Sequence, residues 1–465
     1  MKRIFKLKFL LLFTSFWVFS SCEFDEEINV DPSTPADVTL NAIWPAAQTG
    51  ISWVIGGEIV RINGLLIQHF NGINAQQASN TQYLIRDADM DGMWRRMYHD
   101  SLNPLVDIIK KANEQDSPFD RGKAKVLLAL GLGNFTDGFG DIPYVEAFKA
   151  DDDLFAPTYN SQQEIYNTIQ TLLDEAIADL EGPAGTLTPG YDRIFENDLG
   201  KWVKAANSLK ARYALHLEKK NGSQAFDDAL TLLSEGISSN TEDFEFIFGT
   251  ASNEPNPQYQ FSQDRGGNIE MGEFLIDQLE SKNDPRTEFF REQSTDSDGN
   301  ITDNKVFGSG SFYTKIDAPV VLMSYVEAKF IEAEAHLRKA TPDLVASETA
   351  FKAAVSSSIL KITGATDDAY IANYATYAGL ATPEARLERL MTEKYIAMYS
   401  QGIESWTDYR RTGFPILTPN PNGSNGFNLN GEIPRRLPYP QTEVDLNPKT
   451  PITSPNLQTP VWWDE

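Results

Sequence analysis

Apolar residues recur every three to four positions in six long segments, and this helical periodicity restricts the chain to a mainly α-helical fold. Gly182-Pro183 ends the clearest of them, at 163–180, because glycine and proline both disfavour helix. The remaining segments are 201–220, 223–237, 323–340, 342–360 and 382–402. A further helix is expected near the N-terminus, at 41–55.

Two helix pairs share one internal spacing, which predicts that each packs as a helix–turn–helix unit. The matching positions are Leu209, Tyr213, Ala225, Ala229 and Leu232 in one pair and Phe330, Glu334, Ala346, Ala350 and Ala353 in the other. The arrangement resembles the tetratricopeptide unit of about 34 residues, although the large aromatic and glycine positions of that unit are not reproduced. Each pair has an apolar face that it cannot bury alone, so we predict a stacked α-solenoid scaffold.

Two regions lack this periodicity. Residues 249–316 are rich in Asn, Gln, Asp, Gly, Ser and aromatics, and residues 412–465 are rich in Pro, Asn and Gly. Apolar residues are interspersed in both, which favours long ordered loops and a few short hairpins over disorder. Binding sites tend to lie on such loops when a rigid scaffold holds them.

The N-terminus has the pattern of a secreted lipoprotein. Basic residues precede a short apolar run that ends in Ser20, Ser21 and Cys22, and Cys22 is the only cysteine of the chain. This ending resembles a bacterial lipobox, with Phe19 in place of the usual Leu. We therefore expect a signal peptide at 1–21 and a lipid anchor on Cys22. An ordinary cleaved secretory peptide with an incidental cysteine is the alternative.

An acidic patch follows directly, consisting of Glu23, Asp25, Glu26 and Glu27. It resembles the surface-export signal of Bacteroidota lipoproteins; the alternative is a solvated acidic linker. We expect residues 22–37 to form a tether and residues 38–465 to form a single domain.

The charge and the cysteine content of the chain restrict which classes of ligand and cofactor it can bind. Without the four basic residues of the leader, 36 basic residues face 66 acidic ones, a net charge of −30. This acidity argues against nucleic acid and anionic lipid surfaces, and less strongly against polyanionic glycans, and so favours a neutral ligand. Cys22 has no partner for a disulfide, and the four histidines lack metal-ligand spacing, so we expect no metal and no cofactor.

Four motifs resemble one family in order along the chain. Segment 393–415 carries Trp406, Asp408, Arg410, Arg411, Thr412 and Gly413 of a W-x-D-L-R-R-T-G motif, with Glu404 in place of the usual Arg. Segments 93–113, 124–148 and 435–448 resemble its W-x-x-x-Y, F-G-D-V-P and closing N-P motifs. The chain therefore resembles the SusD/RagB outer-membrane lipoproteins, in their divergent second branch.

The resemblance implies a cell-surface protein of the outer membrane that binds an oligosaccharide or polysaccharide without cleaving it. It also implies a partner, a SusC-like TonB-dependent barrel transporter that receives the glycan. Most motif residues are expected to be structural: Trp94 and Tyr98 in packing, Gly138–Pro143 at a helix exit, and Trp406, Asp408 and Arg410 in fixing a loop.

A glycan surface needs aromatic rings for sugar faces and amides for hydroxyls. Segments 70–87, 252–267 and 306–315 offer this mixture in stretches without helical pattern, and Trp53 is expected nearby. The candidate ligand-binding residues are Trp53, Asn74, Gln77, Tyr83, Tyr259, Phe261, Phe312 and Tyr313. For any single aromatic among them, packing in the core is an equal alternative.

Three other possibilities stay open. Segment 296–303 begins like a calcium loop but has Phe307 at its twelfth position, which favours a plain turn. A glycan hydrolase would need two carboxylates across a cleft, and no motif isolates such a pair. A tetratricopeptide-like solenoid could instead bind peptides or serve as a scaffold. Among neutral polymers, a laminarin-type β-glucan is one candidate ligand.

Overall fold

The computed structural model describes residues 38–465, except 184, 186, 188, 189, 296, 297, 299, 300, 305–310 and 452–456. The expected signal peptide, Cys22 and the acidic tether lie outside the described residues, so the lipid anchor stays a prediction. Among the described helices, none is long and apolar enough to cross a membrane.

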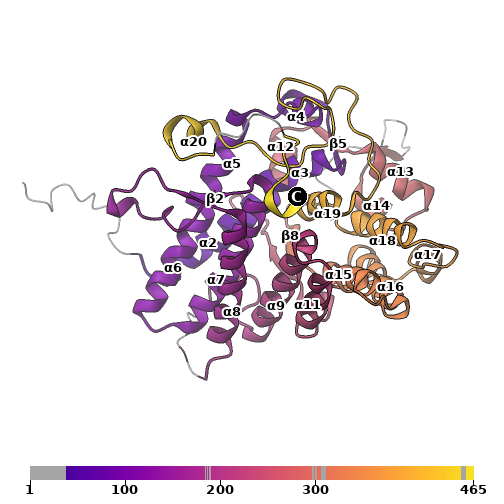
Figure 1. The fold of residues 1–465 in the computed structure, drawn as a ribbon. Helices are drawn as coiled ribbons and strands as arrows, with labels where there is room; N and C mark the ends of the chain where they lie inside the picture. The colour runs from indigo at the N-terminus through magenta and orange to yellow at the C-terminus, as the bar shows by residue number, and fades with distance from the viewer. Residues whose placement is uncertain are drawn as a thin grey trace, which may run out of the picture.

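Successive helices of the chain pack side by side in a curved array, which Figure 1 shows running from α6 at the left to α17 at the right. The array consists of α6 (Asn103–Glu114), α7 (Pro118–Phe139), α8 (Gln162–Leu180), α9 (Leu199–His216), α11 (Gln224–Leu233), α15 (Tyr325–Arg338), α16 (Leu344–Thr363), α17 (Asp368–Tyr374) and α18 (Pro383–Ala397). The mainly α-helical, tetratricopeptide-like fold expected from periodicity is confirmed.

The periodic residues explain the array. In α8, Ser161 and Glu164 form a capping box at the start of the helix, and the predicted apolar stripe is buried against α7 and α9. In the paired helices, α9 packs on α11 and α15 packs on α16. The small residues Ala225, Ala229 and Ala350 are buried between them, as the shared spacing predicts, whereas Ala346 and Ala353 are only half-buried.

Some predicted boundaries are wrong. The helix expected at 382–402 ends at Ala397, and a separate helix, α19 (Gly402–Thr412), follows. Ser400 between them has a φ of +68°, which ends the first helix. A Cβ at Gly402 would lie 2.7 Å from the backbone nitrogen of Gly64, so the chain turns here to bring α19 against α3. The helix expected at 201–220 likewise breaks at Leu217 into α9 and α10 (Glu218–Asn221).

In the N-terminal helices, short π-helical turns interrupt the α-helix. One continuous run consists of α2 (Leu40–Val54), η2 (Ile55–Ile59) and α3 (Val60–Leu66), and another of α5 (Asp91–Arg96), η4 (Met97–Leu102) and α6. The helix expected at 41–55 is therefore confirmed as α2. Such π-turns are frequent at functional sites.

The segments expected to be irregular contain more regular structure than predicted. Region 70–87 holds β1 (Phe70–Gly72), α4 (Ala75–Thr81) and the start of η3 (Asp87–Met90). Region 249–316 holds α12 (Pro257–Asp264), β5 (Ile269–Met271), α13 (Glu273–Ser281), α14 (Thr287–Phe290), β6 (Glu292–Thr295) and β7 (Ile301–Asn304). The elements are too short for periodicity to reveal, because they have three to nine residues each and so complete fewer than three periods of a helical pattern.

The strands of the described chain form four antiparallel pairs. They are β1 with β5, β2 (Ile142–Pro143) with β3 (Tyr159–Asn160), β4 (Phe244–Ile247) with β8 (Pro319–Met323), and β6 with β7. Residues 301–303 of the calcium-loop-like stretch belong to β7, and Asp296, Asn300 and Phe307 lie outside the described residues, so the plain turn favoured there stays a prediction.

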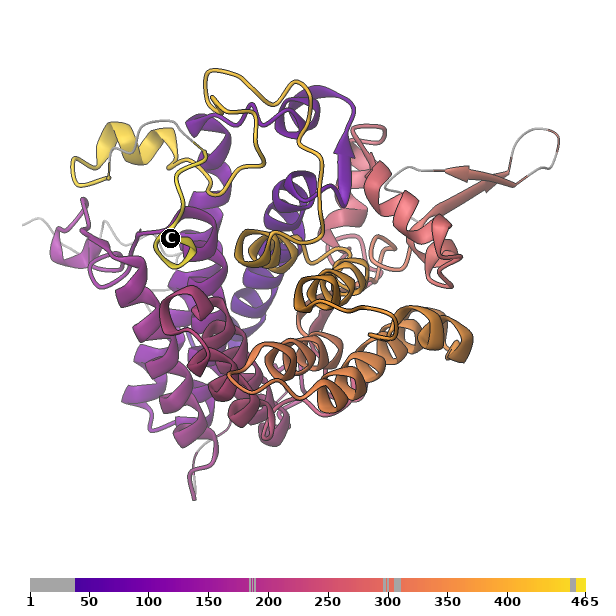
Figure 2. The same cartoon turned by 45° about the vertical axis from the view of Figure 1, so that its right-hand side comes forward.

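The C-terminal segment runs over the N-terminal helices, as its yellow trace in Figure 2 shows, and carries α20 (Gln441–Leu446). Trp463 near the end of the chain is fully buried and donates its indole N–H to Asp137 of α7 at 2.9 Å. The C-terminal Trp463 and the first described helix, α2, therefore belong to one hydrophobic core.

Candidate functional site

Two of the three segments predicted from sequence to contact ligand are brought together by strand pairing. β1 pairs with β5, and the side-chain amide of Asn74 donates to the carbonyl of Gly267 at 2.7 Å. A Cβ at Gly72 would lie 2.0 Å from the carbonyl oxygen of Gln77, so only glycine lets β1 turn this closely into α4. As a result α4 and α12 lie near each other, at the top of Figure 1.

A hollow of about 180 Å³ opens between these elements. We call it the α3–α4 groove and define it by its lining residues: Glu58, Arg61, Ile62, Gln76, Gln77, Asn80, Asp89, Met90, Gly92, Met93 and Phe261. The residues come from η2, α3, α4, η3, α5 and α12, so six elements build one site.

Two half-buried aromatic rings flank the charged residues of the groove. The Arg61 guanidinium lies 4.4 Å from the ring centre of Phe261, and the Arg96 guanidinium lies 4.7 Å from that of Trp53. The Glu58 carboxylate lies 3.5 Å from Nε of Arg96 and is close enough to Arg61 to raise the pKa of that guanidinium. Gly57 contributes to the same arrangement, since a Cβ there would contact both Trp53 and Arg61 at 3.8 Å.

Attraction between opposite charges holds Arg61, Glu58 and Arg96 together. Burial lowers the pKa of Arg61 to about 10, although the neighbouring Glu58 carboxylate opposes that shift. On the opposite wall, the Gln76 amide donates to Asp89 at 3.1 Å. The groove thus combines aromatic rings, side-chain amides and balanced charges. Such a mixture suits a ligand ring that has hydroxyl groups around its rim and apolar C–H groups on its faces.

The structure corrects two of the predicted ligand residues. Tyr83 is 1 % exposed and its hydroxyl accepts a hydrogen bond from the backbone of Asn420 at 3.1 Å. Tyr313 is 5 % exposed and packs against Phe290 and Tyr399. Both rings are covered by chain segments distant in sequence, so neither offers a face for stacking on a sugar.

The other candidates divide between the groove and its surroundings. Gln77 and Phe261 line the groove, and Trp53 lies beside it. Asn74 is exposed at the β1–α4 junction, and Tyr259 is half-buried on α12. Phe312 packs edge-on against Tyr313 and bonds through its backbone to Phe289, so it is not part of the groove.

Sequence reasoning missed much of the groove, including its charged residues Glu58, Arg61 and Asp89, and it also missed the neighbouring Arg96. The available signal was the pair Glu58 and Arg61, two charges three positions apart inside the apolar run 51–67. Charged residues are seldom buried within such a run unless they are paired or line a site.

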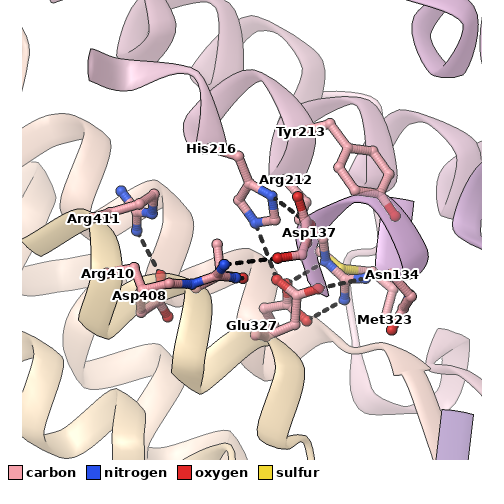
Figure 3. Close-up of polar contacts among 12 residues, drawn as sticks. Asn134, Asp137, Arg212, Tyr213, His216, Met323, Glu327, Asp408, Arg410 and Arg411 are labelled. Atoms are coloured by element: carbon pink, nitrogen blue, oxygen red, sulfur yellow. Dashed lines mark hydrogen bonds and ion pairs between the residues drawn. The ribbon is translucent and has the colours of Figure 1, made fainter. Parts of the chain in front are cut away.

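A second concentration of charge lies in the core and is drawn in Figure 3. His216 contacts Asp137 at 3.2 Å and Glu404 at 3.1 Å, and Arg212 binds both Glu327, at 2.5 Å, and Glu404, at 3.4 Å. All of these side chains are buried, so the network joins α7, α9, α15 and α19 and has no access for a ligand.

The family-like motif residues lie next to this network and hold helices together. Arg410 lies 3.6 Å over the ring of Trp406 and donates to the carbonyl of Asp137 at 2.7 Å. Asp408 forms its carboxylate–guanidinium pair with Arg411, at 2.5 Å, and not with Arg410. The structural role expected for these residues fits their burial.

The remaining motif residues also pack as expected. Trp94 and Tyr98 contact each other and Phe135 in an aromatic cluster. α7 ends at Gly140, whose φ of +85° suits a helix exit.

Two larger hollows, of about 520 and 460 Å³, are less suited to a glycan. The larger has no aromatic residue in its lining. The other contains Tyr144, but its cations Arg121 and Lys125 are already paired with Asp179. Among the described residues, no group of three His, Cys, Asp or Glu is arranged to hold a metal ion.

Comparisons with known proteins agree with this architecture. A family model, SusD-like_2, described as starch-binding and associating with the outer membrane, matches residues 36–440. The chain matches no curated protein. It is similar to a SusD/RagB family protein from Bacteroides thetaiotaomicron, with 24% identity, 92% of this chain and 99% of that chain covered, and a TM-score of 0.77.

Two further solved structures carry ligand information in their names. A chitin-binding protein is 25% identical, with 92% of this chain and 100% of that chain covered and a TM-score of 0.75. A chitin-binding SusD homolog from Flavobacterium johnsoniae is 21% identical, with 92% and 98% covered and a TM-score of 0.75. These likenesses show that the fold is shared.

Proposed function

The chain belongs to the SusD-like family of starch-binding proteins that associate with the outer membrane, and on this premise we propose that it captures a neutral glycan at the α3–α4 groove. The observation that carries the proposal is that the half-buried ring of Phe261 lines a hollow together with Gln76, Gln77 and Asn80, while the half-buried ring of Trp53 lies beside it. Rings of this kind stack on the C–H faces of sugars, while amides serve the hydroxyls.

The charge of the chain supports a neutral ligand. The net charge is −26 over the whole sequence. A polyanionic glycan would meet repulsion on approach, whereas a neutral polymer would not. A laminarin-type β-glucan is one neutral polymer that belongs in the first panel of ligands.

We further propose that the protein is lipidated at Cys22, is exposed on the outer-membrane surface and delivers glycan to a SusC-like TonB-dependent transporter. The leader pattern before Cys22 and the acidic patch after it support this location at the cell surface. The family's association with the outer membrane supports the partner. In this arrangement the protein only binds glycan, and cleavage belongs to other proteins.

A glycan array with the soluble domain tests the proposal. We expect binding to at least one neutral oligosaccharide and recovery of that oligosaccharide uncleaved. Release of new reducing ends by the pure protein would identify a hydrolase instead. Binding of peptides with no glycan bound would identify a peptide-binding solenoid.

A further inference from the structure

Helix α12 brings the ring of Phe261 to the α3–α4 groove, but the helix is only eight residues long. Its start is fixed locally, because the Asn256 side chain accepts hydrogen bonds from the backbone N–H groups of Gln258 and Tyr259, at 2.7 and 3.3 Å. The amide of Asn256 also donates to the carbonyl of Ala318 at 3.0 Å. These contacts determine where α12 begins, but they leave a short helix free to turn about its own axis.

A second attachment comes from the side chain of Gln258, which is 1 % exposed. Its Nε2 donates to the carbonyls of Gly56 and Gly57 in η2, to the second at 3.2 Å. An amide NH2 group has two N–H donors, one for each of these carbonyls. The Oε1 atom of Gln258 is buried and accepts no hydrogen bond, so this donation is all the hydrogen bonding that the amide does.

The carbonyls that accept these bonds belong to a π-helical turn. At the end of η2 the backbone N–H of Val60 bonds to the carbonyl of Ile55, five residues back. It thereby passes over the carbonyl of Gly56, which it would use in an α-helix. The carbonyl of Gly56 can then accept a hydrogen bond from outside the helix, and Gln258 supplies the donor.

The same face of α12 carries the aromatic ring of the groove. Gln258 and Phe261 are three positions apart, so their side chains leave the helix on one side. The Phe261 ring centre lies 4.4 Å from the guanidinium of Arg61, which follows Gly57 by about one helical turn. The two contacts together, Gln258 on η2 and Phe261 on Arg61, fix the rotation of α12 about its axis.

We infer that Gln258 is a positioning residue of the glycan site, which holds the Phe261 ring in place over the groove without touching the ligand. This inference rests on the proposed function and adds to it a residue that does not line the groove. A ring that is already held in place loses less conformational freedom when a sugar stacks on it. The amide of Gln258 therefore contributes to glycan affinity through the ring of Phe261.

The test is a double-mutant cycle between Gln258→Leu and Phe261→Ala, with affinity measured by calorimetric titration of the soluble mature chain. The titrants are laminarihexaose, cellohexaose, maltohexaose and chitohexaose, and the cycle uses the one that binds the wild-type protein most tightly. Gln258→Leu should weaken binding at least fivefold when the Phe261 ring is present and less than twofold when it is absent. This dependence on the ring distinguishes positioning from a general loss of stability.

Gln260→Leu is the matched control, because it removes an amide of the same helix that donates to the nearby carbonyl of Pro255, at 2.7 Å, instead of to η2. This variant should keep the wild-type affinity within twofold. Melting temperatures of all variants are measured alongside. If Gln258→Leu fails to fold, Gln258→Met, which keeps the length of the side chain without its donors, carries the same cycle.

The outcomes separate the inference from its premise. Wild-type affinity in folded Gln258→Leu, or an equal loss with and without the Phe261 ring, would overturn the positioning role and leave the glycan site in place. Wild-type affinity in Phe261→Ala would overturn the groove as the glycan site. Failure of the wild-type protein to bind any glycan on the array would overturn the proposed function itself, and the inference with it.

Discussion

At the scale of single residues, the aromatic side chains differ most in whether the fold covers the faces of their rings. Tyr83 and Trp53 both belong to regions with candidate ligand residues, yet Tyr83 is covered by the segment around Asn420 and Trp53 is only half-buried. The sequence near Tyr83 contains no sign of this cover, because the covering residues lie more than three hundred positions away. Composition therefore pointed to segments that build the groove, but it could not distinguish the buried ring of Tyr83 from the half-buried rings of Trp53 and Phe261.

The buried tyrosines should matter for stability. Tyr83→Ala and Tyr313→Ala should each lower the free energy of unfolding by about 3–5 kcal/mol, since each removes a large packed side chain. Chemical denaturation would measure the loss. Tyr191→Ala is the control, because Tyr191 is 37 % exposed, and it should change stability by less than about 0.5 kcal/mol. An unaltered denaturation midpoint for Tyr313→Ala would contradict its assignment to the core.

Arg411 should be the most sensitive of the motif arginines. It binds Glu334 through two hydrogen bonds of 3.0 Å and Asp408 at 2.5 Å, all buried. Arg411→Ala would remove one of the two cations from each of the buried carboxylates of Glu334 and Asp408, which keep only Arg338 and Lys394. The variant should cost about 3–5 kcal/mol in the free energy of unfolding. Arg95→Ala removes an exposed arginine and is the control. Equal stability of the two variants would show that the buried pairs do not act as described.

At the scale of elements, the long helices were predictable and their ends were not. The stripe of α8 was evident because nineteen residues give several turns of periodicity. The break between α18 and α19 depends on Gly402 meeting the backbone of α3, a tertiary contact that no local pattern encodes. For the same reason the sequence pattern did not reveal α4 and α12, two short helices whose residues line the groove.

His216 makes the junction of α7, α9 and α19 sensitive to pH. Burial alone would lower its pKa, but Asp137 and Glu404 outweigh that effect and raise the pKa to about 9. The folded state therefore holds a proton that the unfolded chain releases above about pH 6.5. This stabilisation is fully present below pH 6.5 and is lost as pH rises through about 9, an effect on the order of 3 kcal/mol.

The expected result is a fall in unfolding free energy between pH 6.5 and 9 in the wild-type protein, measured by urea denaturation. His216→Gln should show a much flatter profile over that range and a lower stability at pH 6.5. His99→Gln removes a histidine whose side chain is 77 % exposed and should retain the wild-type slope. A wild-type profile without slope would show that His216 is neutral in the folded protein.

At the scale of the whole molecule, the structure separates a scaffold from a site. The array from α6 to α18 supplies rigidity, and the groove lies where the first helices meet segments 70–87 and 252–267. The family-like motifs lie in the buried network of the scaffold, which explains why they identify the fold but say little about the ligand. The anchor proposed at Cys22 is a third, independent part.

Cys22→Ala should separate anchoring from binding. We expect the variant to lose retention at the cell surface and glycan uptake, because no lipid is attached, while the purified protein keeps its glycan affinity. Surface labelling of cells and calorimetry of the purified protein measure the two effects. Loss of affinity in the purified Cys22→Ala protein would contradict the independence of tether and groove.

The most direct test of the central claim is calorimetric titration of the Trp53→Ala/Phe261→Ala double variant with the oligosaccharide that the wild-type protein binds best. Each ring should contribute about 1 kcal/mol by stacking, so the double variant should bind at least tenfold more weakly. Circular dichroism should show a fold that remains intact at the temperature of the titration. Wild-type affinity in a folded double variant would show that the α3–α4 groove is not where the glycan binds.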